Sequence, residues 1–266
     1  PSLESFQNTK TGKYALISMD ERFGNVRLPE ILCADVRKER RKKSMQSHFT
    51  TFLIDHVREA LNLNEQVILF QNRRGYTPLW MCEICNWTPK CKNCDVSLTY
   101  HKHTNSLKCH YCSYNIPPVG SCSACGSNRL NMLGFGTEKI EDELSLMFPD
   151  KVIKRLDLDT TRSKNAYSTL LNDFDNRKID ILIGTHRIVT KGLDFDNVNL
   201  VGVLDADMLL NRTDFRAFER SFQLMTQVAG RSGRREKRGK VVIQTGDPEH
   251  WVIQKVCFSA SKHAKC

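Results

Sequence analysis

The pentapeptide QVILF (residues 66–70) indicates the fold class of the chain. An unbroken apolar run of this length is typical of a strand buried on both faces. Four more short runs share its apolar or alternating character: VIKRLDL (152–158), ILI (181–183), LVGVL (200–204) and VVIQT (241–245). Between them, apolar residues recur at helical spacing in residues 44–61, 137–148, 164–175 and 214–229. Strands that alternate with helices predict an α/β fold with a parallel sheet covered on both faces.

Residues 79–126 interrupt this alternation. The segment has little apolar periodicity and contains several turn residues, and the alternation resumes after it. We therefore interpret it as a module inserted into an α/β domain.

The inserted segment contains eight of the eleven cysteines of the chain, arranged as four Cys-x-x-Cys pairs. In a reducing compartment such pairs indicate metal ligands rather than disulfides, and nothing in the sequence suggests secretion. Eight thiolates complete two closed tetrahedral sites without an open position, which indicates two structural zinc ions. The predicted ligands are Cys82, Cys85, Cys91, Cys94, Cys109, Cys112, Cys122 and Cys125.

The spacing leaves the grouping of the pairs open. Fourteen residues separate Cys94 from Cys109, which favours a nested arrangement in which the two inner pairs share one ion and the two outer pairs share the other. A crossed arrangement is the alternative. We expect the residue after each pair to adopt the left-handed backbone of a tight turn; these residues are Asn86, Asp95, Ser113 and Gly126. The remaining candidates, namely His101, His103, His110, Cys33, Cys257 and Cys266, are interpreted as residues without a metal.

Charge and termini bound the possible functions. The formal net charge is +10, and basic residues cluster in RKERRKK (37–43) and RREKRGK (234–240). Such a run is either a solvated surface or a contact for the phosphate backbone of a nucleic acid.

No apolar run reaches the length of a membrane span. The start, PSLES, lacks a signal peptide and an initiator Met, so we expect an excerpt of a longer protein.

Two further motifs carry chemistry. QVAGRSGR (227–234) follows a predicted helix, and its glycines allow a close backbone path while Arg231 and Arg234 present planar guanidinium groups to a phosphate. GTHRIVTKGLDF (184–195) follows strand ILI, where α/β sheets bind ligands at the carboxyl end of a strand. We expect Arg231 and Arg234 to face a cleft at the carboxyl edge of the sheet.

These motifs resemble motifs VI and V of superfamily 2 helicases. QVAGRSGR matches the Gln-x-x-Gly-Arg-x-Gly-Arg pattern at all five fixed positions. With NRRGY (72–76), GFGTEKIEDEL (134–144), DFRAFER (214–220) and the four cysteine pairs, the chain resembles the primosomal protein N′ (PriA) family of replication-restart helicases over residues 1–257. One departure is His186-Arg187, where the family usually has Gln-Met.

The resemblance implies a RecA-like second helicase lobe over 21–78 and 127–257, the zinc module over 79–126, a remnant of the first lobe over 1–20 and a tail over 258–266. It implies that Arg231, Arg234 and Gln227 act at the ATP γ-phosphate, and that Gly192, Asp194 and Gly230 line the nucleotide site. The implied DNA contacts are Thr185, Lys191, Asn72, Arg73 and Arg74. It also implies the nested zinc grouping.

The function implied is an ATP-dependent 3′→5′ DNA helicase that restarts stalled forks and assembles the primosome. Its implied partners are forked or single-stranded DNA, primosome proteins and single-stranded-DNA-binding protein, and its location is the bacterial cytoplasm at the nucleoid. GFGTEK (134–139) lacks the phosphate-loop frame, so ATP with magnesium would bind only in the full-length protein, and this fragment alone is predicted to be inactive. Asp205 and Asp207 are interpreted as lobe-closing or DNA-side acceptors rather than magnesium ligands. The alternative function is a non-enzymatic zinc-ribbon module that binds nucleic acid or docks partners.

Overall fold

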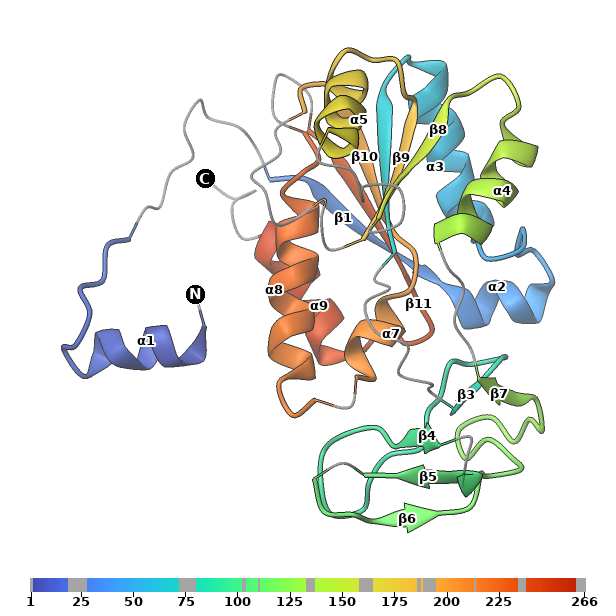
Figure 1. The fold of residues 1–266 in the computed structure, drawn as a ribbon, viewed down its shortest axis with the longest axis vertical. Helices are drawn as coiled ribbons and strands as arrows, with labels where there is room; N and C mark the ends of the chain where they lie inside the picture. The colour runs from blue at the N-terminus through green and yellow to red at the C-terminus, as the bar shows by residue number, and fades with distance from the viewer. Residues whose placement is uncertain are drawn as a thin grey trace.

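The computed structural model describes residues 2–18, 28–71, 80–101, 104–109, 111–132, 137–157, 165–185, 188, 195–212, 214–233 and 238–261. Its centre is a six-stranded sheet in the order β1-β11-β10-β2-β9-β8, and all neighbours pair in parallel (Figure 1). The predicted α/β class is therefore confirmed. The strands are β1 (Glu30–Asp35), β2 (Gln66–Phe70), β8 (Ile153–Leu156), β9 (Ile181–Gly184), β10 (Val198–Val203) and β11 (Lys240–Thr245).

Helices cover both faces of this sheet, as the continuous apolar character of β2 requires. Val67 and Leu69 face a core that includes α3 (Thr51–Asn62) and α4 (Thr137–Met147). Ile68 and Phe70 face the opposite core, which is completed by α5 (Ala166–Asp175), α7 (Ala206–Leu210), α8 (Ala217–Ala229) and α9 (Trp251–Ser261). Alternation along one strand therefore builds two separate cores.

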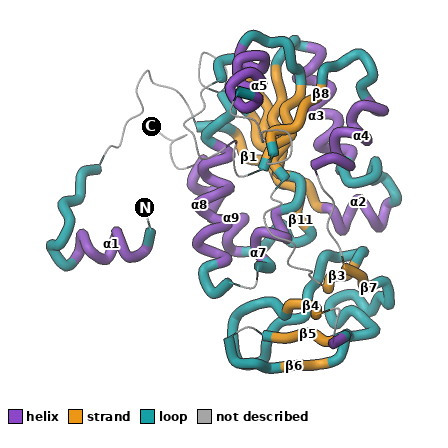
Figure 2. The backbone as a smooth tube through the Cα atoms, viewed as in Figure 1, coloured by secondary structure: helices purple, strands orange, loops and turns teal. Residues whose placement is uncertain are grey.

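The cysteine-rich segment folds outside this sheet (Figure 2). The strands β3 (Trp80–Cys82) and β7 (Leu130–Met132) pair antiparallel at its base. A three-stranded sheet follows from β4 (Thr99–His101), β5 (Ser106–Lys108) and β6 (Asn115–Ile116). The segment lies at the carboxyl end of the main sheet, because Asn86 in it contacts Asp207, which follows β10 in α7, and lies beside Gly246, which directly follows β11 (Figure 1).

Several elements differ from the sequence-based expectation, among them the helices α7 and α9, which were not predicted. The predicted helix over 44–61 begins only at Thr51, because Thr50 caps it by accepting from the backbone N–H of Leu53. The basic run 37–43 lies largely in a short helix, α2 (Val36–Lys42). The strand β1, at the sheet edge beside β11, was not predicted.

An additional helix, α1 (Leu3–Lys10), precedes the sheet in the chain, and Glu4 in it forms an ion pair with Arg216 at the start of α8. Among the described residues, none of the helices combines the length and apolar character that crossing a bilayer requires.

Candidate metal centres and helicase motifs

The eight paired cysteines form two clusters. In each cluster the four sulfur atoms lie within 4.8 Å of one another. The outer cluster contains Cys82, Cys85, Cys122 and Cys125, and the inner cluster contains Cys91, Cys94, Cys109 and Cys112. The structure therefore settles the grouping in favour of the nested arrangement.

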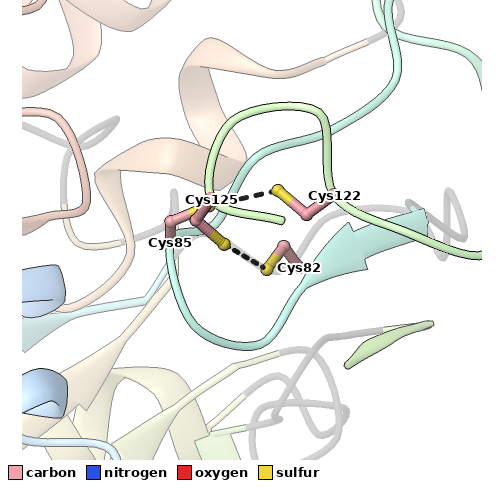
Figure 3. Close-up of side chains that lie close together, drawn as sticks. All are labelled: Cys82, Cys85, Cys122 and Cys125. Atoms are coloured by element: carbon pink, nitrogen blue, oxygen red, sulfur yellow. Dashed lines mark hydrogen bonds between the residues drawn. The ribbon is translucent and has the colours of Figure 1, made fainter. Parts of the chain in front are cut away.

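The outer cluster has the spacing of a tetrahedral metal site. The Sγ atoms of Cys82 and Cys125 are 3.6 Å apart, and those of Cys85 and Cys122 are 3.5 Å apart (Figure 3). A tetrahedral zinc with bonds of about 2.3 Å separates its sulfur ligands by about 3.8 Å, so the thiols need little movement to bind the ion. Four sulfur donors leave no position for a water or substrate, which is typical of a structural site.

The inner cluster is similar but more exposed. The Sγ atoms of Cys91 and Cys112 are 3.4 Å apart, and the backbone N–H of Tyr111 donates to Cys109 Sγ at 3.5 Å. Cys112 is exposed, and its pKa is lowered to about 6, first because the backbone N–H of Tyr114 hydrogen-bonds the thiolate. In the outer cluster, burial raises the pKa of Cys85. Because a metal binds thiolates, loading the outer cluster must release a proton from Cys85.

Three of the four Cys-x-x-Cys turns have the predicted left-handed residue. Asn86, Ser113 and Gly126 have φ values of 60°, 61° and 72°. We call each such turn, from its first Cys to the residue after its second Cys, a knuckle. In each, the N–H of the last residue donates to the carbonyl of the first Cys. The expectation is wrong for Asp95, which is absent from the positive-φ residues; there the N–H of Val96 donates to the carbonyl of Cys94 instead.

The structure describes the motif QVAGRSGR from Gln227 to Gly233. The Ser232 hydroxyl donates to the carbonyls of Asn199 at 2.8 Å and Lys240 at 3.0 Å, and the N–H of Gly233 donates to Val198. Val198 and Lys240 begin β10 and β11, so this loop lies at the amino ends of the strands. The expected position at the carboxyl edge is wrong for this loop. The physical reason is the crossover: α8 runs back along the parallel sheet, and the loop after it must reach the start of β11.

The structure describes three of the predicted catalytic and nucleotide-site residues. Arg231 is half-buried, Gly230 ends α8, and Gln227 is exposed in its last turn. Gln227 also lines a hollow of about 170 Å³ between α7 and α8. Arg234, Gly192 and Asp194 lie outside the described residues.

Of the predicted DNA contacts, only Thr185 is described. It follows β9 at the carboxyl edge and is 7% exposed. Asn72, Arg73, Arg74, Lys191 and the departing pair His186-Arg187 lie outside the described residues.

Asp205 and Asp207 are structural acceptors in this fold. Asp205 caps α7 by accepting from the N–H of Met208 at 3.1 Å. Asp207 is 4% exposed and accepts from Asn86 in the first knuckle, so it contacts the cysteine-rich segment. Sequence reasoning missed Asn86 and its second partner Arg40 as contact residues. The only available signal was an Asn, rather than Gly, directly after a Cys-x-x-Cys pair.

Family models agree with this architecture. The Cys-rich region domain of the PriA DNA helicase matches residues 91–117, and the helicase conserved C-terminal domain matches residues 130–236. The parallel sheet with its cysteine-rich insertion is therefore a C-terminal helicase lobe with two clusters that could hold metal ions.

Similar curated proteins indicate which family of helicases the chain resembles. Replication restart protein PriA of Bacillus subtilis is 44% identical over 254 residues, which are 96% of this chain and 31% of that protein. Its counterpart in Rickettsia conorii is 41% identical over 257 residues, 96% of this chain and 39% of that protein. Together with the two family models, these relatives identify the chain as a C-terminal helicase region of the PriA family. The chain spans about a third of the length of the relatives it matches.

Among solved structures, S. cerevisiae Dbp5 bound to RNA and ADP BeF3 is 12% identical with a TM-score of 0.43, over 100% of this chain and 47% of that chain. The fold assignment rests on the sheet order and not on this likeness.

Proposed function

We propose that this chain is the nucleotide-sensing and DNA-engaging C-terminal part of an ATP-dependent 3′→5′ DNA helicase that restarts stalled replication forks and assembles the primosome. The supporting observation is the separation of two motifs along one sheet. The Gly230–Gly233 loop is bonded to the amino ends of β10 and β11, whereas Thr185 and the cysteine-rich segment lie at the carboxyl ends. One rigid sheet would then connect a nucleotide end with a DNA end.

At the nucleotide end, we assign Arg231 and Arg234 to the γ-phosphate of ATP with magnesium, held mainly by the first helicase lobe. Arginine fingers of this type contribute about a thousandfold or more to phosphoryl transfer. Gln227 would respond to lobe closure, and Gly192, Asp194 and Gly230 would line the site. Because the chain contains no phosphate-loop pattern, we expect it to hydrolyse no ATP by itself.

At the DNA end, we assign Thr185, Lys191, Asn72, Arg73 and Arg74 to the phosphate backbone of forked or single-stranded DNA. Thr185 is nearly buried, so only a small part of its surface is available for such a contact. Primosome proteins and single-stranded-DNA-binding protein would dock at the zinc module, in the bacterial cytoplasm at the nucleoid.

We propose zinc for both cysteine clusters, since the donors are sulfur alone and the matching family model is a zinc ribbon. The proposed division is 1–20 for the remnant of the first lobe, 21–78 and 127–257 for the second lobe, 79–126 for the zinc module and 258–266 for the tail.

The decisive experiment replaces Arg234 by Ala in the full-length protein. DNA-stimulated ATP hydrolysis should fall about a thousandfold while DNA binding is retained. Arg238→Ala is the control, because it removes the same charge four positions away, from a side chain that donates to the Leu28 carbonyl. Equal hydrolysis by Arg234→Ala and the parent would show that this region takes no part in the hydrolysis and would favour its role as a non-enzymatic zinc-ribbon module.

A further inference from the structure

The first knuckle contacts the helicase lobe through Asn86. This residue follows Cys85, has a φ of 60° and donates its backbone N–H to the carbonyl of Cys82 at 3.0 Å. The loop that holds two sulfur atoms of the outer cluster therefore also fixes the direction of the Asn86 side chain. Any movement of the metal ligands in this knuckle must therefore also move the Asn86 side chain.

The Asn86 amide bonds two separate elements of the lobe. Its Nδ2 donates to Asp207 Oδ2 at 2.6 Å, and its Oδ1 accepts from Arg40 Nη1 at 2.7 Å. Arg40 lies on α2 and Asp207 on α7, at the carboxyl ends of β1 and β10. Both hydrogen-bonding groups of one amide are thus used across the boundary.

Asp207 depends on this contact because it is a buried carboxyl. Thr245 Oγ1 donates to Oδ1 at 2.7 Å, and the N–H of Gly246 shares Oδ2 with Asn86 at 2.6 Å. Burial raises the pKa of Asp207, and the hydrogen bond from Asn86 is the largest influence that opposes the rise. Loss of one donor to a buried charged group has a higher energetic cost than loss of an exposed one.

The backbone of the knuckle also sits directly on the turn after β11. A Cβ added at Gly246 would lie 2.9 Å from the carbonyl oxygen of Cys85 and 3.3 Å from Cβ of Asn86. Only a glycine admits so close an approach, so the contact between knuckle and lobe is a packed interface as well as a polar one.

We propose that Asn86 and Asp207 are positioning residues that couple metal occupancy of the outer cluster to the packing of α7 and the end of β11. The helix α7 packs against α8, and Gly230 is the C-cap of α8. Metal loading at the carboxyl edge would thereby order the helix that leads into Arg231 at the other edge. Because coupling between two sites is reciprocal, a change in the lobe must also alter metal retention.

The test compares Asn86→Gly with Ser113→Gly in the zinc-loaded chain. Gly suits the left-handed backbone at both positions, so each variant keeps its knuckle. Asn86→Gly also removes the two bonds to the lobe, whereas the Ser113 side chain is exposed in the inner cluster's knuckle.

Two measurements follow. For Asn86→Gly, a chromogenic chelator should remove one of two zinc equivalents at least about tenfold faster than from the parent, and amide exchange in residues 204–211 and 244–247 should rise at least about tenfold. Ser113→Gly should leave exchange in those residues unchanged. Removing zinc from the parent with a chelator should raise amide exchange in the same residues. Removing zinc from Asn86→Gly should raise their exchange little further, because it is already high.

Asp207→Asn tests the reciprocal direction, since it changes no cysteine and no residue of the cysteine-rich segment. It should speed the release of one zinc equivalent by about tenfold. The proposal is overturned if Asn86→Gly and Ser113→Gly behave alike, or if Asp207→Asn retains both zinc ions as the parent does. Neither readout uses ATP hydrolysis, so the result is independent of the proposed helicase function.

Discussion

The Ser232 hydroxyl donates to the backbone carbonyl of Lys240 at 3.0 Å and so joins the loop after α8 to the first residue of β11. The same hydroxyl reaches Asn199 at 2.8 Å, beside the start of β10. Ser232 is 1% exposed, so both bonds are shielded from water. Ser232, the residue between the two glycine-arginine pairs of QVAGRSGR, therefore holds the loop after α8 against the starts of β10 and β11.

Ser232→Ala should lower the free energy of unfolding by about 1–3 kcal/mol, because the carbonyls of Asn199 and Lys240 lose the buried hydroxyl donor that they share. Urea unfolding of the zinc-loaded chain measures this change. Ser221→Ala is the matched control: its hydroxyl is equally buried but donates to the Ala217 carbonyl within α8, which the helix ladder also satisfies. If the two variants lose the same stability, the strand-joining role of Ser232 is wrong.

A second prediction concerns Gly202 in the middle of β10. A Cβ there would lie 2.6 Å from Leu69 Cδ2 and 3.1 Å from Leu53 Cδ1, so Gly202 lets α3 pack closely on the sheet. Gly202→Ala should overpack this core and destabilise the chain by about 1–3 kcal/mol. Gly120→Ala should have little effect, because no atom lies within 4 Å of its added Cβ. The midpoints of urea unfolding decide between these outcomes.

The sequence predicted much of this architecture because its signals are local. QVILF matches β2 residue for residue, and the cysteine spacing favoured the nested clusters that the structure contains. The strand β1 was missed because EILCAD lies at the sheet edge and is only partly buried, unlike the fully buried β2. No local pattern separates it from a loop.

The contact between the lobe and the cysteine-rich segment could not be predicted, because it joins residues far apart in the chain. Arg40 belongs to a basic run whose composition indicates a solvated surface or a phosphate contact, yet its guanidinium is bonded to Asn86. The position of Arg231 was misjudged for a related reason: whether a loop lies at the amino or carboxyl edge follows from the direction of the preceding helix, which the motif itself does not specify.

A third prediction concerns metal removal. The cysteine-rich segment has only small apolar clusters of its own, and cysteines make up part of them. Structural zinc contributes roughly 10–16 kcal/mol in small modules, so chelation should unfold residues 79–126 while β2, β9 and β10 remain folded. Amide exchange before and after chelation tests this, with metal analysis expected to give two zinc ions per chain. Equal exchange in the segment with and without metal would contradict the prediction.

The last prediction concerns pH and Asp205. Burial raises the pKa of this carboxyl from 3.8 to about 7, and the neighbouring charge of Asp207 adds to the rise. Between these two pH values the folded chain therefore retains a proton that the unfolded chain has released. The contribution of Asp205 to stability is thus fully present below pH 3.8 and is lost as the pH rises towards 7.

Asp205→Asn removes this titration but keeps an Oδ1 acceptor for the N–H of Met208. Relative to the parent, the variant should gain stability as the pH rises from 5.5 to about 7, by about 2 kcal/mol, and the difference should level off above pH 7. Urea unfolding across this range measures the difference. Asp55→Asn, at an exposed position beside Arg58, provides the control for the loss of one negative charge. A constant difference between Asp205→Asn and the parent at every pH would show that Asp205 does not titrate in this window, because only a titrating group makes that difference depend on pH.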